Sequence, residues 1–332
     1  MKRLIYKDLI SLFAILLSVI CFFPLFANAS EPDYEALAEE RKKLTIESNL
    51  YDNWPAGPEL GAESAILIDA NTGIVLYEKN IHAKLYPASI TKILTALVAY
   101  DNCDMKEMVT FSYDAVNSID WRYDANMGIT GGSSITMEET LYGMLVGSAN
   151  EAAIAIAEHV SGKGNLKDFA KLMNEKAVSL GCTDSNFVTP NGIHDDNHYT
   201  TASDLTKIMA MACENETFCK LIHTPTHYFG RTNVHKEDGW SIVTNSNKIL
   251  IDPWLIAKTS EGYDTHAVCM VGGKTGSTSM AGTGMTTYSV NENGHELFIA
   301  VCGIPMELYS YQTRYVASVV ASKRSVSGFL YS

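Results

Sequence analysis

Three short motifs occur in a fixed order along this chain of 332 residues. They are Ser89-Ile90-Thr91-Lys92, Ser148-Ala149-Asn150 and Lys274-Thr275-Gly276. A Ser-x-x-Lys pair arises by chance about once in a chain of this length, so alone it would describe a polar residue and a solvated lysine on a helix. Ser89 and Lys92 form the only such pair in the chain, and the ordered triple predicts a serine acyl-transfer site.

The first motif supplies a nucleophile and a base. A serine hydroxyl is a poor nucleophile at neutral pH and needs an adjacent base to take its proton. Apolar residues at helical spacing predict a helix over residues 88–99, opened by Pro87. Ser89 and Lys92 then share one helix face, and the partly positive N-terminus favours the charge that grows on the attacked carbonyl oxygen. Lysine acts as a base only when burial or a nearby positive charge lowers its pKa, and we expect Lys274 to supply that charge.

Around these motifs the chain resembles a known family, the serine D-alanyl-D-alanine carboxypeptidases (peptidase S11-like) among the low-molecular-mass penicillin-binding proteins. The resemblance covers about residues 62–304, through the segments 62–73, 86–99, 127–153, 186–202 and 273–282. It implies the serine β-lactamase/D,D-peptidase-like fold, of the α/β (α+β) class. In that fold an antiparallel sheet flanked by helices lies beside a helical lobe. A turn at 71–73 and strand patterns at 282–290 and 296–304 agree with such a sheet.

The resemblance also implies a role for each motif residue. Ser89 is expected to be the acylated nucleophile and Lys92 its base, while Ser148 and Asn150 relay protons and hold the substrate amide. The backbone N–H groups of Ser89 and Ser277 are expected to form the oxyanion hole. The implied substrate-binding residues, of which the first two hold the terminal carboxylate, are Lys274, Thr275, Gly276 and Ser277.

The implied partners follow from the family. They are the D-Ala-D-Ala end of a peptidoglycan stem peptide, from which the terminal D-Ala is removed, and the β-lactam antibiotics that acylate the same serine and inhibit the enzyme. No cofactor and no metal is expected.

Two other functions share this fold. A serine β-lactamase needs a base that hydrolyses its acyl-enzyme, usually a Glu on a loop between the second and third motifs, and no Glu-x-x-x-Asn occurs there. A non-catalytic receptor for penicillin or wall peptides has no need of an activated nucleophile, so Ser89 and Lys92 count against it. A carboxypeptidase is therefore favoured.

Glu151 follows the second motif where many relatives carry Asp, and we expect it to cap or pack locally.

One pair of histidines has a spacing that is also found in metal sites. His194 and His198 are four residues apart, but Pro190, Asn191 and Gly192 predict a loop instead of a helix. We therefore expect the two histidines to fix this loop near the cleft.

Six cysteines follow the N-terminal segment, and they permit disulfides without requiring them. None has Cys-x-x-Cys spacing. Cys213 and Cys219 are close enough in sequence to pair. Cys269 and Cys302 lie in apolar, strand-like runs, which predicts that both are buried free thiols. The full set is Cys103, Cys182, Cys213, Cys219, Cys269 and Cys302.

The N-terminus predicts export. Lys2, Arg3 and Lys7 precede an apolar run at 9–26, and residues 27–29, Ala-Asn-Ala, fit a signal-peptidase site. Residues 1–29 are predicted to be a signal peptide, with a retained membrane anchor as the alternative. We expect an extracytoplasmic protein of the cell envelope that touches the membrane only through this segment if it is uncleaved. The formal net charge of −13 argues against nucleic-acid binding.

Composition divides the remaining chain. Residues 30–60 are charged and helix-prone until a Pro- and Gly-containing break at 53–58, and they are expected to form a spacer in which Trp54 is a candidate for docking. Residues 61–324 are expected to form the catalytic domain, closed by a helix at 308–323. A short tail at 325–332 follows, and we expect no C-terminal membrane anchor.

Overall fold

The computed structural model describes residues 32–162, 165–251, 268–291 and 296–306, and one compact unit begins at Tyr34. The predicted signal peptide, closing helix and tail lie outside the described residues. None of the helices in the described ranges has both the length and the apolar character that a bilayer-spanning helix needs.

Five antiparallel strands form the main sheet, in the order β2-β1-β9-β8-β7. The first hairpin therefore pairs with the last strand, with Leu67 opposite Ile299 at the centre of the sheet. Apolar and β-branched residues fill β1 and β9, as expected for strands with both faces covered. The predicted turn at 71–73 and both late strands are confirmed. The strands are β1 (Ser64–Asp69), β2 (Val75–Lys79), β7 (Val268–Thr278), β8 (Gly282–Asn291) and β9 (Glu296–Ile304).

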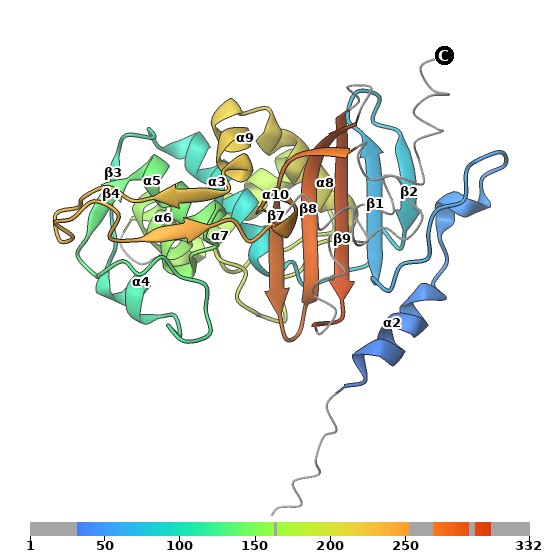
Figure 1. Cartoon of the computed structure of the whole chain (residues 1–332), viewed down its shortest axis with the longest axis horizontal. Helices are drawn as coiled ribbons and strands as arrows, with labels where there is room; N and C mark the ends of the chain where they lie inside the picture. Colours follow the sequence, from blue (N-terminus) through green and yellow to red (C-terminus); the bar gives the residue numbers. More distant parts are fainter. Residues whose placement is uncertain (1–31, 163–164, 252–267, 292–295, 307–332) are drawn as a thin grey trace, which may run out of the picture. The chain divides into compact units, whose positions relative to one another are not determined.

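A lobe of helices lies beside β7, the edge strand of this sheet (Figure 1). Its central helix begins at Lys92 and is buried along almost its whole length, because Ile93, Leu94 and Leu97 pack into one large hydrophobic core. The helices of the lobe are α3 (Lys92–Asn102), α4 (Tyr113–Asn117), α5 (Met137–Leu145), α6 (Asn150–Ser161) and α7 (Leu166–Ser179).

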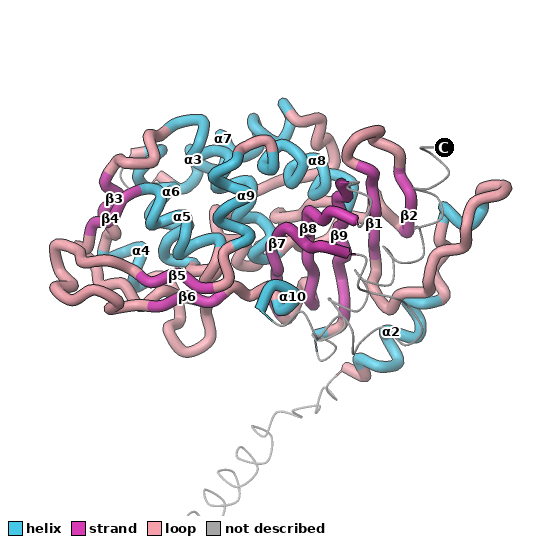
Figure 2. Tube along the Cα trace, turned by 45° about the horizontal axis from the view of Figure 1, so that its top comes forward, coloured by secondary structure: helices cyan, strands magenta, loops and turns pink. Residues whose placement is uncertain are grey.

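Two small hairpins border the lobe. β3 (Met108–Thr110) pairs with β4 (Ser134–Thr136), and β5 (Thr226–Tyr228) pairs with β6 (Ile242–Thr244). Figures 1 and 2 place β3 and β4 at the end of the lobe that is remote from the main sheet.

Further helices connect the lobe to the sheet. α8 (Ala202–Cys213) contacts β1, β8 and β9, and α9 (Glu216–His223) contacts β7 (Figure 2). Both have side-chain N-caps: Thr201 accepts from the Asp204 N–H group, and Asn215 accepts from the Thr217 and Phe218 N–H groups. The short helix α10 (Lys248–Ile251) precedes β7. The predicted architecture, a helix-flanked antiparallel sheet beside a helical lobe, is confirmed.

The segment expected to be a spacer packs on the sheet from Tyr34 onward. It contains α2 (Tyr34–Lys42) and the 3₁₀ helix η1 (Glu47–Leu50). Ile46 joins a hydrophobic core on the sheet with β1 and β9 residues, and the Trp54 indole N–H donates to the Leu76 carbonyl at 2.9 Å. Within the range expected to form a spacer, Ile46 is thus buried and Trp54 half-buried against the sheet. The docking of Trp54 is confirmed.

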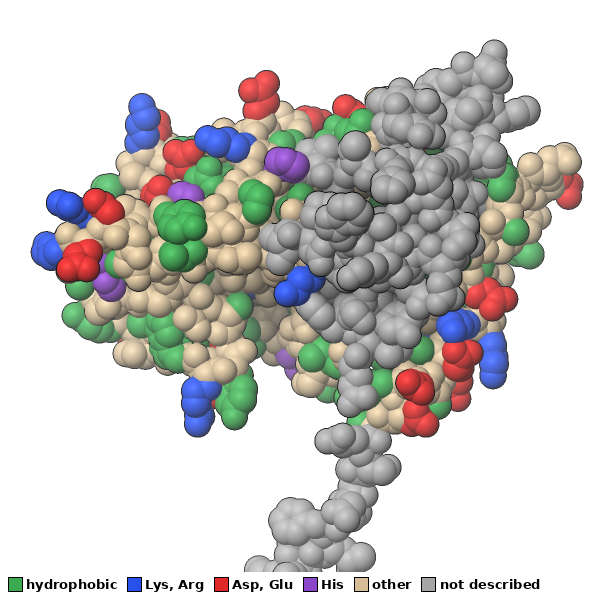
Figure 3. Space-filling view, in the orientation of Figure 1, with side chains coloured by type: hydrophobic (Ala, Val, Ile, Leu, Met, Phe, Trp, Pro, Cys, Tyr) green, Lys and Arg blue, Asp and Glu red, His purple; other side chains and the backbone are tan. Residues whose placement is uncertain are grey.

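The described cysteines are free thiols. Sγ of Cys219 lies 3.2 Å from the carbonyl oxygen of Cys213, and the two sulfurs are not bonded. Cys302 is buried in the sheet, as predicted. Cys269 lies in β7, but its side chain is not described, so its state as a buried free thiol stays a prediction. On the surface, acidic and basic side chains lie next to one another at several places on the described part of the face in Figure 3.

Candidate active site

The turn that carries Ser89, the expected nucleophile, is a 3₁₀ helix that leads into α3. η2 (Ala88–Thr91) carries Ser89, and Lys92 is the first residue of α3. The predicted helix at 88–99 therefore starts as a tighter turn, in which side chains three residues apart lie one above the other. Nζ of Lys92 lies 2.7 Å from Oγ of Ser89. Ala88 has a φ of 48°, a left-handed conformation that is uncommon for a residue with a side chain and is found at functional sites.

Lys92 is fully buried and its amine has three oxygen neighbours. Besides the Ser89 hydroxyl, Nζ contacts Oδ1 of Asn150 at 2.7 Å and the carbonyl oxygen of Asn191 at 2.8 Å. Both of these oxygens only accept hydrogen bonds. When the amine is neutral, its two N–H groups point at them and its lone pair is left for the Ser89 proton. Lys92 is thus placed to act as a base.

The charge state of Lys92 follows from its surroundings. Burial lowers the pKa of Lys92 well below its ordinary value, and the positive charge of Lys274 lowers it further. The carboxylates of Glu151 and Asp124 act in the opposite direction but do not cancel the effect. The predicted influence of Lys274 on Lys92 is therefore present, although burial is the larger cause.

The second motif forms the turn between α5 and α6. Ser148 lies in this turn with a φ of 59°, and Asn150 begins α6. The next residue, Glu151, is buried and its Oε1 accepts from the Met127 N–H group at 2.7 Å. Burial raises the pKa of Glu151 to about 7. Glu151 therefore packs locally, as expected, and holds the segment before the second motif.

The third motif lies on β7 at the edge of the sheet. Nζ of Lys274 contacts Oγ of Ser148 at 3.0 Å, and burial lowers the pKa of Lys274 to about 7. Oγ1 of Thr275 lies 2.6 Å from Oγ of Ser246. Gly276 is required by packing, because a Cβ atom there would lie 2.5 Å from the carbonyl oxygen of Pro87. The strand can approach the turn that carries Ser89 only where a side chain is missing.

A loop after α7 completes the surroundings of Lys92. Gly192 has a φ of 80°, and a Cβ atom on it would lie 1.9 Å from the Ala88 carbonyl oxygen. His198 is buried below this loop. Its Nε2 lies 2.8 Å from Oγ1 of Thr91, and its Nδ1 accepts from the Val188 N–H group at 3.0 Å. The prediction that histidine fixes this loop near the cleft is confirmed for His198, and burial lowers its pKa to about 4.

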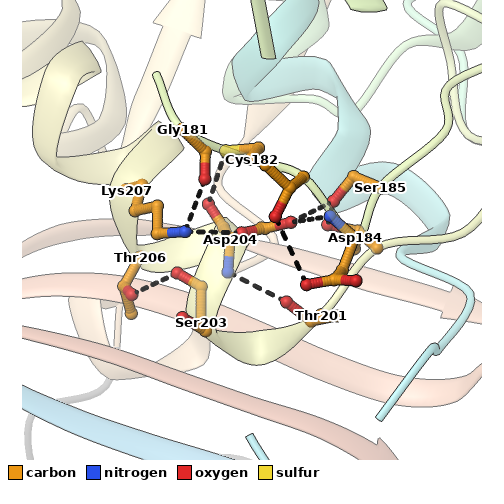
Figure 4. Close-up of polar contacts among 11 residues, drawn as sticks. Gly181, Cys182, Asp184, Ser185, Thr201, Ser203, Asp204, Thr206 and Lys207 are labelled. Atoms are coloured by element: carbon orange, nitrogen blue, oxygen red, sulfur yellow. Dashed lines mark hydrogen bonds and ion pairs between the residues drawn. The ribbon is translucent and has the colours of Figure 1, made fainter. Parts of the chain in front are cut away.

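Asp204, on α8, anchors the start of the same loop (Figure 4). Its buried carboxylate accepts from Ser185 Oγ at 2.7 Å and from the Asp184 N–H group at 3.2 Å. Its other oxygen accepts from Lys207 Nζ at 2.8 Å, and that amine also donates to the Gly181 carbonyl at 2.7 Å. These contacts fix the first residues of the loop that presents the Asn191 carbonyl to Lys92.

These segments enclose a cleft of about 280 Å³. Of the predicted site residues, Lys92 and Lys274 are buried beside it and the other six line its wall. The lining residues are Ser89, Tyr123, Asp124, Ala125, Ser148, Asn150, Asn191, Gly192, Ile193, Ser246, Thr275, Gly276, Ser277 and Thr278.

A family model for D-alanyl-D-alanine carboxypeptidases of the peptidase S11 type matches residues 52–305. The chain belongs to this family. Among curated members, DacF of Bacillus subtilis (strain 168) is 35% identical over 189 residues, which are 55% of this chain and 46% of the relative. DacA of Haemophilus influenzae is 28% identical over 270 residues, which are 79% of this chain and 61% of the relative. The chain thus spans about half to three fifths of the length of these two carboxypeptidases.

Solved structures of the family agree with the fold. A D-alanyl-D-alanine carboxypeptidase from Mycobacterium tuberculosis H37Rv superposes with a TM-score of 0.66 at 27% identity, covering 83% of this chain and 92% of that one. The DD-transpeptidase of Streptomyces K15 superposes with a TM-score of 0.68 at 24% identity, covering 80% and 99%, and this likeness shows the fold alone.

Some residues of this S11 cleft have no role that the sequence motifs predict. Asn191 and Gly192 lie in the segment 186–202, which resembles the family, so the sequence does contain a signal that points to this pair. Asp124 lines the cleft, and its Oδ2 accepts from the Asp120 N–H group at 2.8 Å. No motif indicates Ser246 or Tyr123, which reach the cleft through the arrangement of loops.

Proposed function

We propose that the protein is a serine-type D-Ala-D-Ala carboxypeptidase that removes the terminal D-Ala of peptidoglycan stem peptides through an acyl-enzyme at Ser89. The observation that carries this proposal is the position of the Lys92 amine. Its two acceptor-only neighbours leave its lone pair for the Ser89 hydroxyl at 2.7 Å. Membership of the S11 family supports the choice of substrate.

Acylation follows from these contacts. The Ser89 oxygen attacks the carbonyl carbon between the two D-alanines while Lys92 takes the hydroxyl proton. The backbone N–H groups of Ser89 and Ser277 stabilise the negative charge on the carbonyl oxygen. The C–N bond breaks as the leaving nitrogen receives a proton, which Lys92 returns with Ser148 as the relay. D-Ala departs, and the rest of the peptide stays as an ester on Ser89.

The remaining residues hold the substrate and complete the cycle. Lys274 and Thr275 bind the terminal carboxylate, and Asn150 holds the peptide amide beside Lys92. Gly276 and Ser277 continue the binding strand. Water then attacks the ester carbonyl, and the Ser89 oxygen regains its proton as the shortened peptide leaves.

Penicillin should acylate the same hydroxyl and stay bound for longer. Opening of the β-lactam ring leaves the amine tethered to the acyl group, where it obstructs water, whereas a D-Ala leaving group departs. This difference separates a carboxypeptidase from a β-lactamase. Fast penicillin hydrolysis without D-Ala release would favour the β-lactamase, and acylation without any turnover would favour the receptor.

The test combines two measurements on the purified protein. D-Ala release from a pentapeptide that ends in D-Ala-D-Ala is followed beside mass spectrometry of the penicillin adduct. We expect one penicillin on the peptide that contains Ser89, and neither adduct nor release in Ser89→Ala. Ser118→Ala, at an exposed helix end, is the matched control and should behave as wild type. Labelling that survives in Ser89→Ala would overturn the assignment.

We also propose that the protein works in the cell envelope, outside the cytoplasm. Its proposed substrate is located there, and the N-terminal pattern at 1–29 fits an exported chain. Protease added to intact cells with a permeable wall should degrade the protein while a cytoplasmic marker survives. Protection equal to that of the marker would contradict export.

A further inference from the structure

Three potential metal ligands meet at the end of the helical lobe. Cys103, Glu107 and His159 each offer one ligand atom, and these atoms all lie within 4.8 Å of one another. Glu107 directly precedes β3, which Figures 1 and 2 place far from the main sheet. The proposed catalytic residues take no part in this cluster.

The backbone holds each of the three side chains in place. Cys103 directly follows α3 and its N–H group donates to the Ala99 carbonyl at 2.9 Å. Oε1 of Glu107 accepts from the Asp104 N–H group at 2.7 Å, which leaves Oε2 to face Nε2 of His159 at 2.9 Å. His159 lies in the last turns of α6. The ligand atoms are therefore positioned by two helices and a tight turn.

We propose that Cys103, Glu107 and His159 bind a divalent ion of the zinc type, with water as the fourth ligand. A sulfur, an imidazole nitrogen and a carboxylate oxygen form a donor set that suits Zn²⁺ or Co²⁺, whereas Ca²⁺ and Mg²⁺ prefer oxygen alone. Bond lengths of about 2.3 Å to sulfur and about 2.0 Å to nitrogen put ligand atoms about 3.5 Å apart in a tetrahedron. Small side-chain rotations reach this geometry, and the thiol proton leaves to solvent on binding.

The surroundings of the cluster favour a cation. His159 also lines a surface hollow of about 610 Å³, together with Asp114 and Glu158. These acidic side chains attract positive ions to the hollow. Glu107 is exposed, while Cys103 and His159 are half-buried. An ion can therefore enter from solvent, and there is room for a water ligand.

The position of the proposed metal site in the fold determines what a bound ion does to the protein. α3 begins at Lys92 and α6 begins at Asn150, so both helices start at the cleft. The cluster lies at their other ends, about 17 Å along α3 and about 14 Å along α6. A bound ion ties these ends together without touching the substrate. The site is thus structural, and the serine chemistry proceeds without the ion.

The test uses Co²⁺ as a spectroscopic probe of the full-length protein, kept reduced by a thiol-free reductant. Titration should give one Co²⁺ per chain with a thiolate-to-cobalt charge-transfer band that Zn²⁺ abolishes. The band should be lost in Cys103→Ser. The affinity should fall at least about tenfold in His159→Gln. Zinc should raise the unfolding temperature of the wild type by several degrees and leave that of Cys103→Ser unchanged.

Matched variants separate this site from other thiols and imidazoles. Cys213→Ser removes another half-buried thiol, and His82→Gln removes an exposed histidine, so both should keep the band. The proposal is overturned if the wild type gives no band, if the band survives in Cys103→Ser, or if Cys213→Ser abolishes it. Because the signal is a spectrum, its failure is distinct from a failure of the carboxypeptidase assay.

Discussion

Nζ of Lys274 lies 3.0 Å from Oγ of Ser148, so the third motif contacts the second directly. The second motif in turn contacts the first, where Oδ1 of Asn150 meets the Lys92 amine. Two buried lysines therefore belong to one connected network. Burial lowers the pKa of both lysines, to about 7 for Lys274 and well below the ordinary value for Lys92, and the charge of Lys274 also acts on Lys92. Lys92 should lose its proton first, which supports the proposed roles of Lys92 as the base and Lys274 as the positive charge.

This order predicts a bell-shaped pH profile for acylation. The rate should rise with pH as Lys92 becomes neutral and fall as Lys274, with its pKa lowered to about 7, loses its charge. The two limbs describe the coupled pair and not single residues. The second-order rate of labelling by a fluorescent penicillin, measured between about pH 5 and pH 10, gives the profile. Lys274→Arg should remove the falling limb because a guanidinium stays charged. A falling limb that persists in this variant would disprove the assignment.

The two lysines should also respond differently to replacement at a single pH. Lys92→Arg should slow acylation by about 10²–10⁴-fold, the usual contribution of a positioned base, because arginine keeps its proton. Lys274→Arg should lose only about tenfold, since the positive charge survives with altered geometry. Near-ultraviolet circular dichroism controls for folding of both variants. Near-normal acylation by Lys92→Arg would remove Lys92 as the base and point to Ser148 with Lys274.

Glu151 should make stability depend on pH. Burial raises its pKa from 4.5 to about 7, so the folded state binds this proton more tightly than the unfolded state. Stability is therefore lost as the pH rises from about 4.5 to about 7. Glu151→Gln can still accept from Met127 and cannot ionise. Relative to wild type, it should gain stability over this interval, at most about 3 kcal/mol.

Urea unfolding of both proteins at several pH values measures this difference. The lowered pKa of His198 has the opposite effect in the same interval, but it is shared by both proteins and cancels in the comparison. Parallel stability curves for wild type and variant would show that Glu151 does not hold a buried proton.

Gly192→Ala should damage both the fold and acylation. The new Cβ atom would overlap the Ala88 carbonyl oxygen, directly before Ser89. Gly181→Ala is the matched control, because Gly181 has a φ of 74° and a Cβ atom placed on it would meet nothing within 4 Å. Both variants incur the left-handed backbone cost of about 1–2 kcal/mol, but only Gly192→Ala adds a clash. Urea unfolding and penicillin labelling should show a larger loss for Gly192→Ala, and equal losses would contradict the packing argument.

The sequence motifs identified residues that the structure brings together at the cleft, but they did not identify all of its walls. Ser89 and Lys92 are three residues apart, so local geometry alone brings them together. The Asn191 carbonyl is a backbone group with no side-chain signature, and only the folded loop directs it at Lys92. The charged composition of residues 30–60 indicated a spacer, whereas the few apolar side chains at Ile46 and Trp54 decide that the segment packs. Cys103 and His159 meet only because two helices end at the same place.

The pairing of β1 with β9 has a consequence for how the protein folds. Ser64 lies opposite Cys302, and β9 separates β1 from β8 in the sheet. Every residue proposed for catalysis and binding precedes β9, which begins at Glu296. A growing chain that has reached residue 295 therefore contains the proposed site residues and both strands of the β7–β8 pair, but not β9, which joins that pair to β1. Closing such a distant contact is slow, so activity should appear late in folding and in a single step with β9 insertion.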